Sequence, residues 1–175
     1  VTGDVDGGEA DFMELRDPGL PVLRIPTLGR SVRILGDLRT LVAIRRAIKE
    51  YRPDIVHTHT TKAGLLGRLA AMSCGVPVLV HTFHGHILHG YFSRLAVGAV
   101  RLLEAWLAHR TTALVAVGER VRDELIEAGV GRTDQYVVIP PGVETNVLED
   151  PTSARKQLGL PVEGPVVLFV GRLTA

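Results

Sequence analysis

The sequence predicts an α/β fold built on a doubly wound, mostly parallel sheet. Short apolar segments alternate along the chain with longer segments of helical periodicity, which is the order of a parallel sheet with crossover helices. The short segments are also apolar at nearly every position, as expected when helices cover both faces of a sheet. The expected strands are residues 54–58, 77–82, 112–117 and 136–139, and the expected helices are residues 37–51, 61–73, 92–109 and 119–128.

Residue spacing and helix-stopping residues define the first, second and fourth of these helices. In the first, apolar residues recur at helical spacing, at Leu41, Ile44, Ile48 and Tyr51. Residues that stop helices follow the first, second and fourth helices, at Pro53, Gly75 and Gly129 respectively. Each stop precedes an apolar segment, so the alternation of helices and strands continues through the chain.

The third helix, residues 92–109, has a marked apolar face. The face consists of Leu95, Ala99, Leu102, Leu103 and Trp106. We expect this face to belong to the protein core rather than to bind a membrane. The cations of the helix and its end, Arg94, Arg101 and Arg110, are nevertheless compatible with an acidic bilayer surface.

The two ends of the chain predict an incomplete two-domain protein. Residues 9–16 are a short helix candidate, Pro21–Ile25 a short strand, Ser153–Leu158 a brief helix and Pro165–Val170 a buried strand. The first residue is not a methionine, and the last strand candidate lacks a following helix. We therefore expect residues 1–145 to form a first domain that is incomplete at its N-terminus. Residues 146–163 would be a connector, and residues 164–175 would begin a truncated second domain.

Composition excludes several classes of protein. The 175 residues carry a formal charge of +1 and 22% charged side chains, so no basic surface for nucleic acid is expected. No apolar run is long enough to span a membrane, and no signal segment opens the chain. A single cysteine, Cys74, excludes an intrachain disulfide and suits a small buried side chain in a reducing compartment. A soluble cytoplasmic protein is expected.

Candidate binding residues follow the predicted strands, at the sheet edge where parallel folds bind ligands. His57 and His59 end one strand, and Thr60 and Lys62 begin the next helix. Exposed N–H groups, a hydroxyl and an ammonium could hold a phosphate or sugar hydroxyls there. The alternative is that the threonine only caps the helix. Gly64, one turn further, would let the helix approach the sheet closely.

The segment His81-Thr-Phe-His-Gly-His86 is the most distinctive in the chain. Imidazoles that bind a sugar or pyrophosphate are the favoured interpretation, with His84 best placed because Gly85 leaves space beside it. A metal site is disfavoured, because alternate strand residues point to opposite faces and no Cys or Glu accompanies the histidines. For His81 a structural role is favoured.

Two further positions complete the predicted edge. Glu119 begins a helix after a strand, where it is either a site residue or simply an acid favoured by the helix dipole. Gly171 and Arg172 follow the last strand candidate, and the planar guanidinium is suited to bind two oxygens of a pyrophosphate.

Five motifs follow one another in order along the chain: Arg52-Pro-Asp-Ile-Val-His-Thr-His59, Lys62-Ala-Gly-Leu-Leu-Gly-Arg68, His81-Thr-Phe-His-Gly85, Val138-Ile-Pro-Pro-Gly-Val143 and Leu168-Phe-Val-Gly-Arg-Leu173. This ordered series resembles the family 4 glycosyltransferases of the GT-B fold. The resemblance implies two facing Rossmann-like domains and retaining transfer of a sugar from a nucleotide-sugar donor, which is a substrate rather than a cofactor. The implied acceptor is a glycan or a lipid-linked molecule of envelope or exopolysaccharide synthesis, with the cytoplasmic membrane surface as an additional peripheral partner.

The resemblance also implies roles for individual residues. His84 corresponds to the histidine near the donor sugar and Arg172 to the arginine that stabilises the departing diphosphate. Thr60, Lys62 and Gly85 would line the cleft. The donor-binding glutamates of the second domain and the glycine-rich loop after the first strand are missing, so the chain alone is expected to be inactive.

The sequence departs from the family pattern in places, and two other functions stay open. Pro141, Glu144 and Gly118 stand where asparagine, aspartate and serine are common in the family. One alternative is an isomerase like the UDP-N-acetylglucosamine 2-epimerases, which typically have Gly-Asp-Thr where this chain has Thr58-His59-Thr60. The other is a non-catalytic module that binds a sugar or nucleotide.

Overall fold

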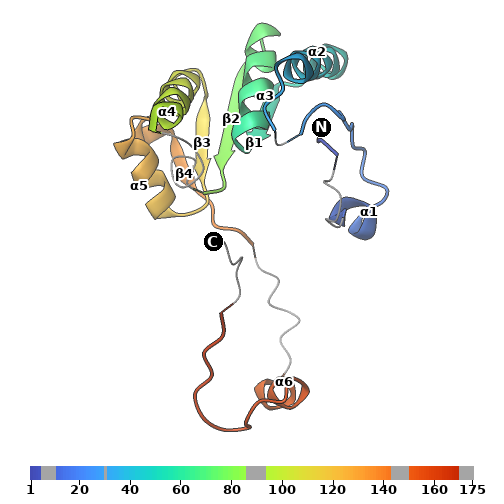
Figure 1. Ribbon diagram of the computed structural model, residues 1–175. Coiled ribbons are helices and arrows are strands. Elements are labelled where there is room, and N and C mark those ends of the chain that lie inside the picture. Colours follow the sequence, from blue (N-terminus) through green and yellow to red (C-terminus); the bar gives the residue numbers. More distant parts are fainter. Residues whose placement is uncertain (5–10, 30, 86–93, 143–149, 170–175) are drawn as a thin grey trace. The chain divides into compact units, whose positions relative to one another are not determined.

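A computed structural model describes the chain except residues 5–10, 30, 86–93, 143–149 and 170–175. It divides into two compact units, Val1–Pro141 and Gly142–Ala175, which are described separately. The helices of the first unit are α1 (Phe12–Arg16), α2 (Ile34–Tyr51), α3 (Thr61–Ser73), α4 (Arg94–Ala108) and α5 (Glu119–Glu127), as Figure 1 shows. Its strands are β1 (Ile55–His59), β2 (Val78–Phe83), β3 (Ala113–Ala116) and β4 (Tyr136–Val138), and a 3-10 turn at Thr133–Gln135 precedes the last strand.

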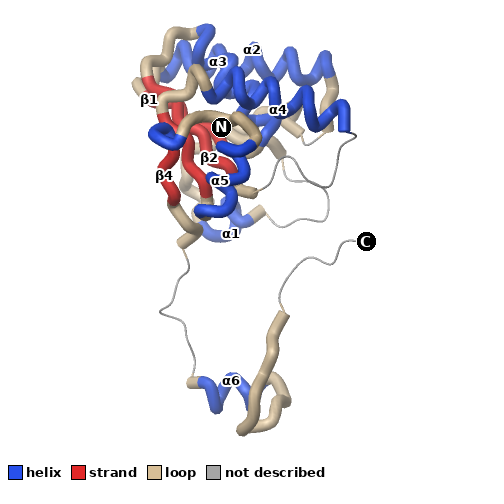
Figure 2. Tube along the Cα trace, turned by 90° about the vertical axis from the view of Figure 1, so that its left-hand side faces the viewer, coloured by secondary structure: helices blue, strands red, loops and turns tan. Residues whose placement is uncertain are grey.

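The four strands form one parallel sheet in the order β1-β2-β3-β4, which confirms the predicted fold class. The register sets Ile55 opposite Val78. Because each strand lies beside its successor, right-handed crossovers place α3, α4 and α5 on one face of the sheet. Figure 2 shows these helices beside the strands, and α2 packs against α3.

Two apolar clusters make up the core beneath this helical layer. The first joins α2 and α3 to β2 through residues that include Ile44, Ile48, Leu66 and Leu79. The second joins β2, β3 and α5 through residues that include Phe83, Leu114 and Leu125. Residues of β1 and β4 that face away from the helices stay exposed, as Ile55 does at 58%.

A buried ion pair joins α3 to α4. The Arg68 guanidinium lies 2.6 Å from the Glu104 carboxylate, and both side chains are fully buried. The Arg68 Nε also donates to the carbonyl of Gly64. Burial raises the pKa of Glu104, and the adjacent Arg68 opposes that shift. Because neither charge could be left unpaired inside the protein, the pair fixes how α4 is rotated against the layer.

The prediction for the apolar face of α4 is therefore wrong. Leu102 is 67% exposed, Trp106 43% and Leu103 38%, whereas Glu104, Leu107 and Ala108 are buried. Helical spacing correctly indicates an apolar face on this helix. The opposite face is also apolar apart from Glu104, however, so the spacing alone does not decide which of the two faces is buried. Pairing with Arg68 turns that opposite face inward. Among the described residues, no helix, α4 included, is long and apolar enough to cross a membrane.

Two strand predictions are also wrong. Pro21–Ile25 forms no strand and contributes one parallel bridge, between Arg24 and Thr2. Residues 165–169 are extended but unpaired, and Val167 is 97% exposed. A strand needs a partner for its backbone N–H and C=O groups, and none lies beside this segment in the described part of the chain. In the second unit, α6 (Pro151–Gln157) begins two residues before the predicted helix, because the Asp150 carboxylate caps it by accepting from the Ser153 amide.

Candidate functional site

The ends of β1 and β2 bring three histidines together, which we call the histidine cluster: His57, His59 and His84. The Nδ1 atom of His59 and the Nε2 atom of His84 lie 2.9 Å apart and share a hydrogen bond. The rings of His57 and His59 have centroids 4.3 Å apart, and those of His59 and His84 5.2 Å apart. The cluster follows from the parallel register, which sets His59 opposite Thr82, two residues before His84.

Two imidazoles of the cluster, those of His57 and His59, have lowered pKa values, which favour the neutral form. Burial lowers the pKa of His57, and electrostatic repulsion between His57 and His84 adds to this effect. The pKa of His59 is lowered by burial first and then by repulsion from His57 and His84. At neutral pH these two rings therefore offer both hydrogen-bond donors and acceptors, which suits sugar hydroxyls. An anion bound there would favour proton uptake by the same rings.

His81 lies beneath the cluster and has the structural role that the sequence favoured. Its ring is 1% exposed, and its Nδ1 shares a 2.8 Å hydrogen bond with the Thr58 hydroxyl. Burial, and to a lesser extent the charge of Arg68, lowers the pKa of His81 to about 3. A Cβ on Gly64 would overlap this ring, and one on Gly67 would lie 2.7 Å from the Thr58 methyl. Both glycines thus permit the close approach of α3 to the sheet.

The residue that begins α3 has an unusual backbone. Thr60 occupies the position before the helix with φ 63° and ψ 163°, a region that favours glycine. Its side chain forms no capping hydrogen bond, so capping does not explain the threonine. Strain of this kind is found where a site requires a particular geometry, and the Thr60 hydroxyl remains available to a ligand.

Lys62 is not the free cation that an anion cradle would need. Its ammonium lies 2.6 Å from the Asp37 carboxylate of α2 and also donates to the carbonyl of Ser31. Sequence reasoning missed this pair, because the two residues are 25 positions apart and no local pattern connects them. A phosphate near Lys62 would have to share the ammonium with Asp37.

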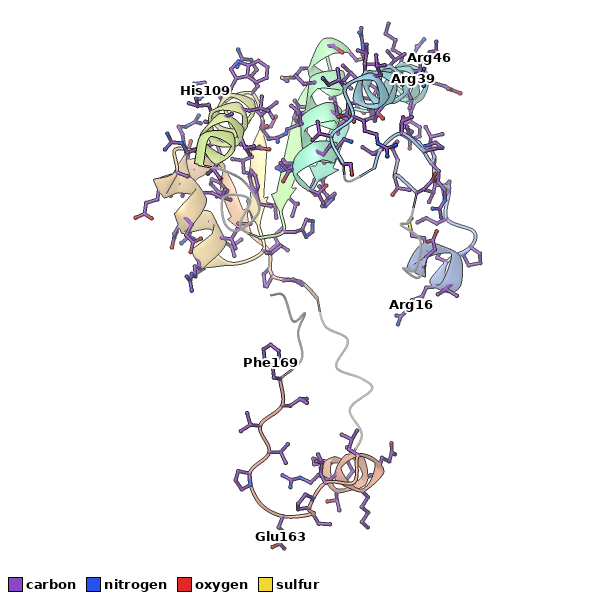
Figure 3. The ribbon with its side chains drawn as sticks, viewed as in Figure 1. Arg16, Arg39, Arg46, His109, Glu163 and Phe169 are labelled. Atoms are coloured by element: carbon purple, nitrogen blue, oxygen red, sulfur yellow. The ribbon has the colours of Figure 1, made fainter. Side chains whose placement is uncertain are left out.

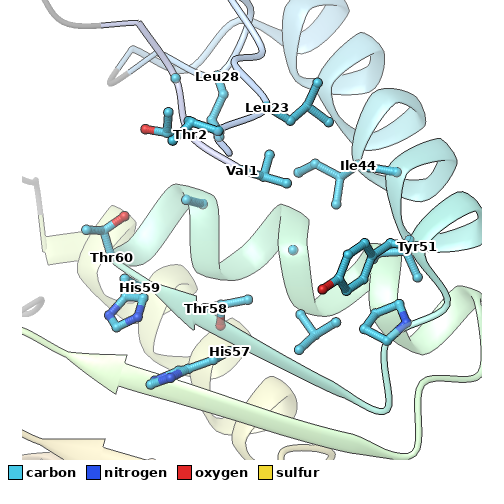
Figure 4. A pocket seen from close by; sticks show the side chains of 18 of the residues that line it. Val1, Thr2, Leu23, Leu28, Ile44, Tyr51, His57, Thr58, His59 and Thr60 are labelled. Carbon is cyan, nitrogen blue, oxygen red and sulfur yellow. The ribbon is translucent and has the colours of Figure 1, made fainter. Parts of the chain in front are cut away.

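A groove of about 1390 Å³ runs beside the cluster. Its polar lining residues include His57, His59, Thr60 and Lys62, and also the acids Asp4, Asp11 and Glu50. Figure 4 shows β1 and the start of α3 on one side and the segment that carries Thr2 and Leu28 on the other; Ile44, Ile48 and Val56 are among the apolar lining residues. Because His59 both lines the groove and contacts His84, the cluster and the groove form one continuous candidate site.

The remaining predicted residues divide into three groups. Gly85 follows His84, and a Cβ added to it would meet no atom within 4 Å, as expected for open space. Glu119 is exposed in the first turn of α5, where its negative charge contributes to the raised pKa of Arg122 in the same helix. Gly171, Arg172 and His86 lie outside the described residues. Within the described ranges, no group of three or more His, Cys, Asp or Glu residues is suited to hold a metal ion.

The sequence matches the family described as "Glycosyl transferase 4-like domain" over residues 1–142. The chain is 31% identical over 161 residues to a UDP-Gal:alpha-D-GlcNAc-diphosphoundecaprenol alpha-1,3-galactosyltransferase of Escherichia coli, covering 90% of this chain and 42% of that one. It is 38% identical over 128 residues to a D-inositol 3-phosphate glycosyltransferase of Acidothermus cellulolyticus, covering 69% and 28%. The chain thus spans less than half the length of these relatives.

Solved structures share the fold. A glycosyltransferase from Rickettsia africae superposes with a TM-score of 0.61 at 24% identity, covering 88% of this chain and 40% of that one. A UDP-N-acetylglucosamine 2-epimerase superposes with a TM-score of 0.52 at 19% identity, covering 68% and 33%. At these identities the likeness shows a common architecture and does not separate transfer from epimerisation.

Proposed function

This chain belongs to the glycosyl transferase 4-like domain family, and we propose that it is the acceptor-side part of an enzyme that transfers a sugar from a nucleotide-sugar donor. The observation that supports the proposal most is the histidine cluster, which stands at the carboxyl edge of the parallel sheet beside the groove. The imidazoles of the cluster, the Thr60 hydroxyl and the first amides of α3 can bind hydroxyl and phosphate groups.

The proposed chemistry breaks the bond between the anomeric carbon of the donor sugar and a diphosphate oxygen. It forms a bond from the same carbon to a hydroxyl oxygen of the acceptor, whose proton passes to the departing diphosphate. Negative charge then grows on the departing diphosphate, and donors that face this charge stabilise the transition state more than the ground state. By family resemblance, His84 faces the donor sugar and Arg172 the diphosphate, and the configuration at the anomeric carbon is retained. His59 would orient the ring of His84 through the hydrogen bond between the His59 Nδ1 and the His84 Nε2.

The proposed acceptor is a lipid-linked glycan of envelope or exopolysaccharide synthesis. The Escherichia coli relative is named for transfer to a sugar that is linked to diphosphoundecaprenol. The Acidothermus relative is instead named for a phosphorylated inositol. In both names the acceptor carries phosphate, and a phosphate at the strained Thr60 and at Lys62 would lie in the groove.

An epimerase-like activity is the second candidate. Its support is the shared fold, whereas Thr58-His59-Thr60 and the family match favour transfer. The third possibility, a binding module without catalysis, applies most directly to the chain by itself, because the second domain would supply the residues that hold the donor.

The deciding experiment uses the full-length parent protein with a panel of UDP-, GDP- and ADP-sugars. NMR would identify the products and the configuration of the new glycosidic bond. Transfer with a retained configuration is expected, and the chain of 175 residues alone should show none. Interconversion of UDP-N-acetylglucosamine with its 2-epimer in the absence of an acceptor would replace the proposal with the epimerase.

A matched pair of variants tests the role of His84 in the same protein. His84→Ala should lower kcat at least a hundredfold without changing the melting temperature, because a group facing the reacting sugar would be lost. His109→Ala, an exposed histidine at the end of α4, serves as the control. Wild-type turnover by His84→Ala would remove this residue from the mechanism.

A further inference from the structure

A largely buried ion pair joins the start of α2 to the start of α3. The Lys62 ammonium lies 2.6 Å from the Oδ1 atom of Asp37, and each side chain is only 17% exposed. The same ammonium donates to the carbonyl of Ser31, which precedes α2. Figure 3 labels two other cations of α2, Arg39 and Arg46, and both are exposed. Asp37 thus pairs across to α3 although its own helix carries arginines.

Asp37 holds the ammonium by charge rather than by a directed hydrogen bond. Its Oδ2 atom accepts from the Arg33 amide at the start of α2. Its Oδ1 atom is buried beside Lys62 but has no well-aligned hydrogen bond to any described residue. A buried oxygen without a hydrogen bond is unfavourable, and charge-assisted hydrogen bonds of good geometry are the strong ones. A ligand oxygen that accepts in line from the ammonium would therefore compete with this carboxylate.

Such a ligand could reach Lys62 from the groove. Thr60 and Lys62 line the groove at the start of α3, and Leu28 and Gly29, which lead to Ser31, line it as well. Figure 4 shows Thr60 and Leu28 in this lining. Among the described lining residues, Lys62 is the one lysine or arginine. An anion in the groove would therefore depend on this ammonium, which Asp37 contacts from α2.

We propose that Asp37 sets the affinity of the groove for phosphate, because it occupies Lys62 until a phosphate oxygen displaces it. This inference rests on the proposed phosphate-bearing acceptor and names the residue that opposes its binding. A neutral sugar leaves the ion pair in place, whereas a phosphate must first release the ammonium, so Asp37 is a specificity-determining residue. The apparent affinity for phosphate is reduced in proportion to the fraction of molecules in which Lys62 is free.

Phosphate binding to the isotope-labelled chain of 175 residues tests the proposal. Inorganic phosphate and glucose 1-phosphate are titrated at one ionic strength of about 0.15 M, which keeps general screening constant. The amide resonances of residues 60–64 report binding, and glucose without phosphate is the control ligand. As phosphate saturates the wild type, the carboxylate carbon of Asp37 should shift, because the ion pair is released. This second readout does not depend on how well any variant folds.

Variants separate the charge of Asp37 from its position. Asp37→Asn keeps an oxygen for the Arg33 amide and should bind both phosphates about fivefold more tightly, or more, because the competing charge is gone. Lys62→Gln should abolish the binding, alone and combined with Asp37→Asn. Asp123→Asn removes an acid of α5 that pairs with Arg122. It changes the net charge of the protein equally, and this matched control should bind like the wild type.

The possible failures are distinguishable. Equal affinity of Asp37→Asn and the wild type, with binding lost in Lys62→Gln, would overturn the role of Asp37 and keep Lys62 as the phosphate ligand. Binding that Lys62→Gln does not reduce would overturn the inference, because the anion would bind elsewhere. No binding by a folded Asp37→Asn would overturn the inference together with the phosphate contact of the acceptor, whereas sugar transfer itself is decided by the panel of nucleotide sugars.

Discussion

Among single residues, the buried His81 makes the most definite prediction about pH. Its pKa is lowered from 6.5 to about 3, chiefly by burial, with repulsion from Arg68 and the histidine cluster as smaller causes. As pH falls below 6.5, the unfolded chain binds a proton at this ring and the folded chain does not. The stability that His81 contributes is therefore complete above pH 6.5 and is lost as pH falls towards 3.

The measurement is urea unfolding at pH 7.5, 6.0 and 5.0. Between pH 7.5 and 5.0 the wild type should lose about 2 kcal/mol more than His81→Asn, with a slope that approaches about 1.4 kcal/mol per pH unit below pH 6.5. Asparagine cannot titrate but can still bond to the Thr58 hydroxyl. His109→Asn, an exposed change, should leave the slope as it is. If the free energy of unfolding fell with pH equally in the wild type and in His81→Asn, the His81 ring would be protonated in the folded protein as it is in the unfolded chain.

At the scale of elements, the approach of α3 to the sheet depends on Gly64. Alanine there would overlap the buried His81 ring, which the Thr58 hydroxyl holds in place. Gly64→Ala should therefore lower the free energy of unfolding by about 1–3 kcal/mol. Gly98→Ala in α4 is the matched control, because its Cβ would meet no atom within 4 Å; better helix propensity should raise stability by up to about 1 kcal/mol. Equal stability of the two variants in urea unfolding would refute close packing at Gly64.

The sequence predicts where a helix or strand begins and ends better than it predicts what that element packs against. The predicted helix 61–73 coincides with α3, and β2 differs from its prediction by one residue at each end, because Gly75 and Pro77 mark the boundary locally. The side of α4 that faces the core could not be predicted, because it is set by the ion pair of Glu104 with Arg68, which lies 36 positions away in the sequence. The histidine cluster was placed correctly at the sheet edge by strand order, whereas the hydrogen bond between His59 and His84 depends on strand register.

At the scale of the whole molecule, the free edge of β1 faces the groove. In the described part of the chain β1 pairs with β2 alone, and Ile55 is 58% exposed. Across the groove, Thr2 and Arg24 form a parallel bridge. The free edge of β1 and the bridged backbone at Thr2 and Arg24 both offer backbone groups that could pair with one more parallel strand lying between them. Such a strand would join the two into one sheet and fill the apolar part of the groove.

We therefore predict that β1 pairs with a further parallel strand in the full-length parent protein. Burial of Ile55 alone should contribute up to about 3 kcal/mol, so the midpoint of urea unfolding should rise. Hydrogen exchange should slow at those β1 amides that do not bond to β2, since they would gain acceptors. The 175-residue chain is the reference, and the amides of β2 that already bond within the sheet are the control and should not change. Unchanged exchange of the β1 amides in the parent protein would mean that β1 is a true sheet edge, and the groove would then be open to ligands along its whole length.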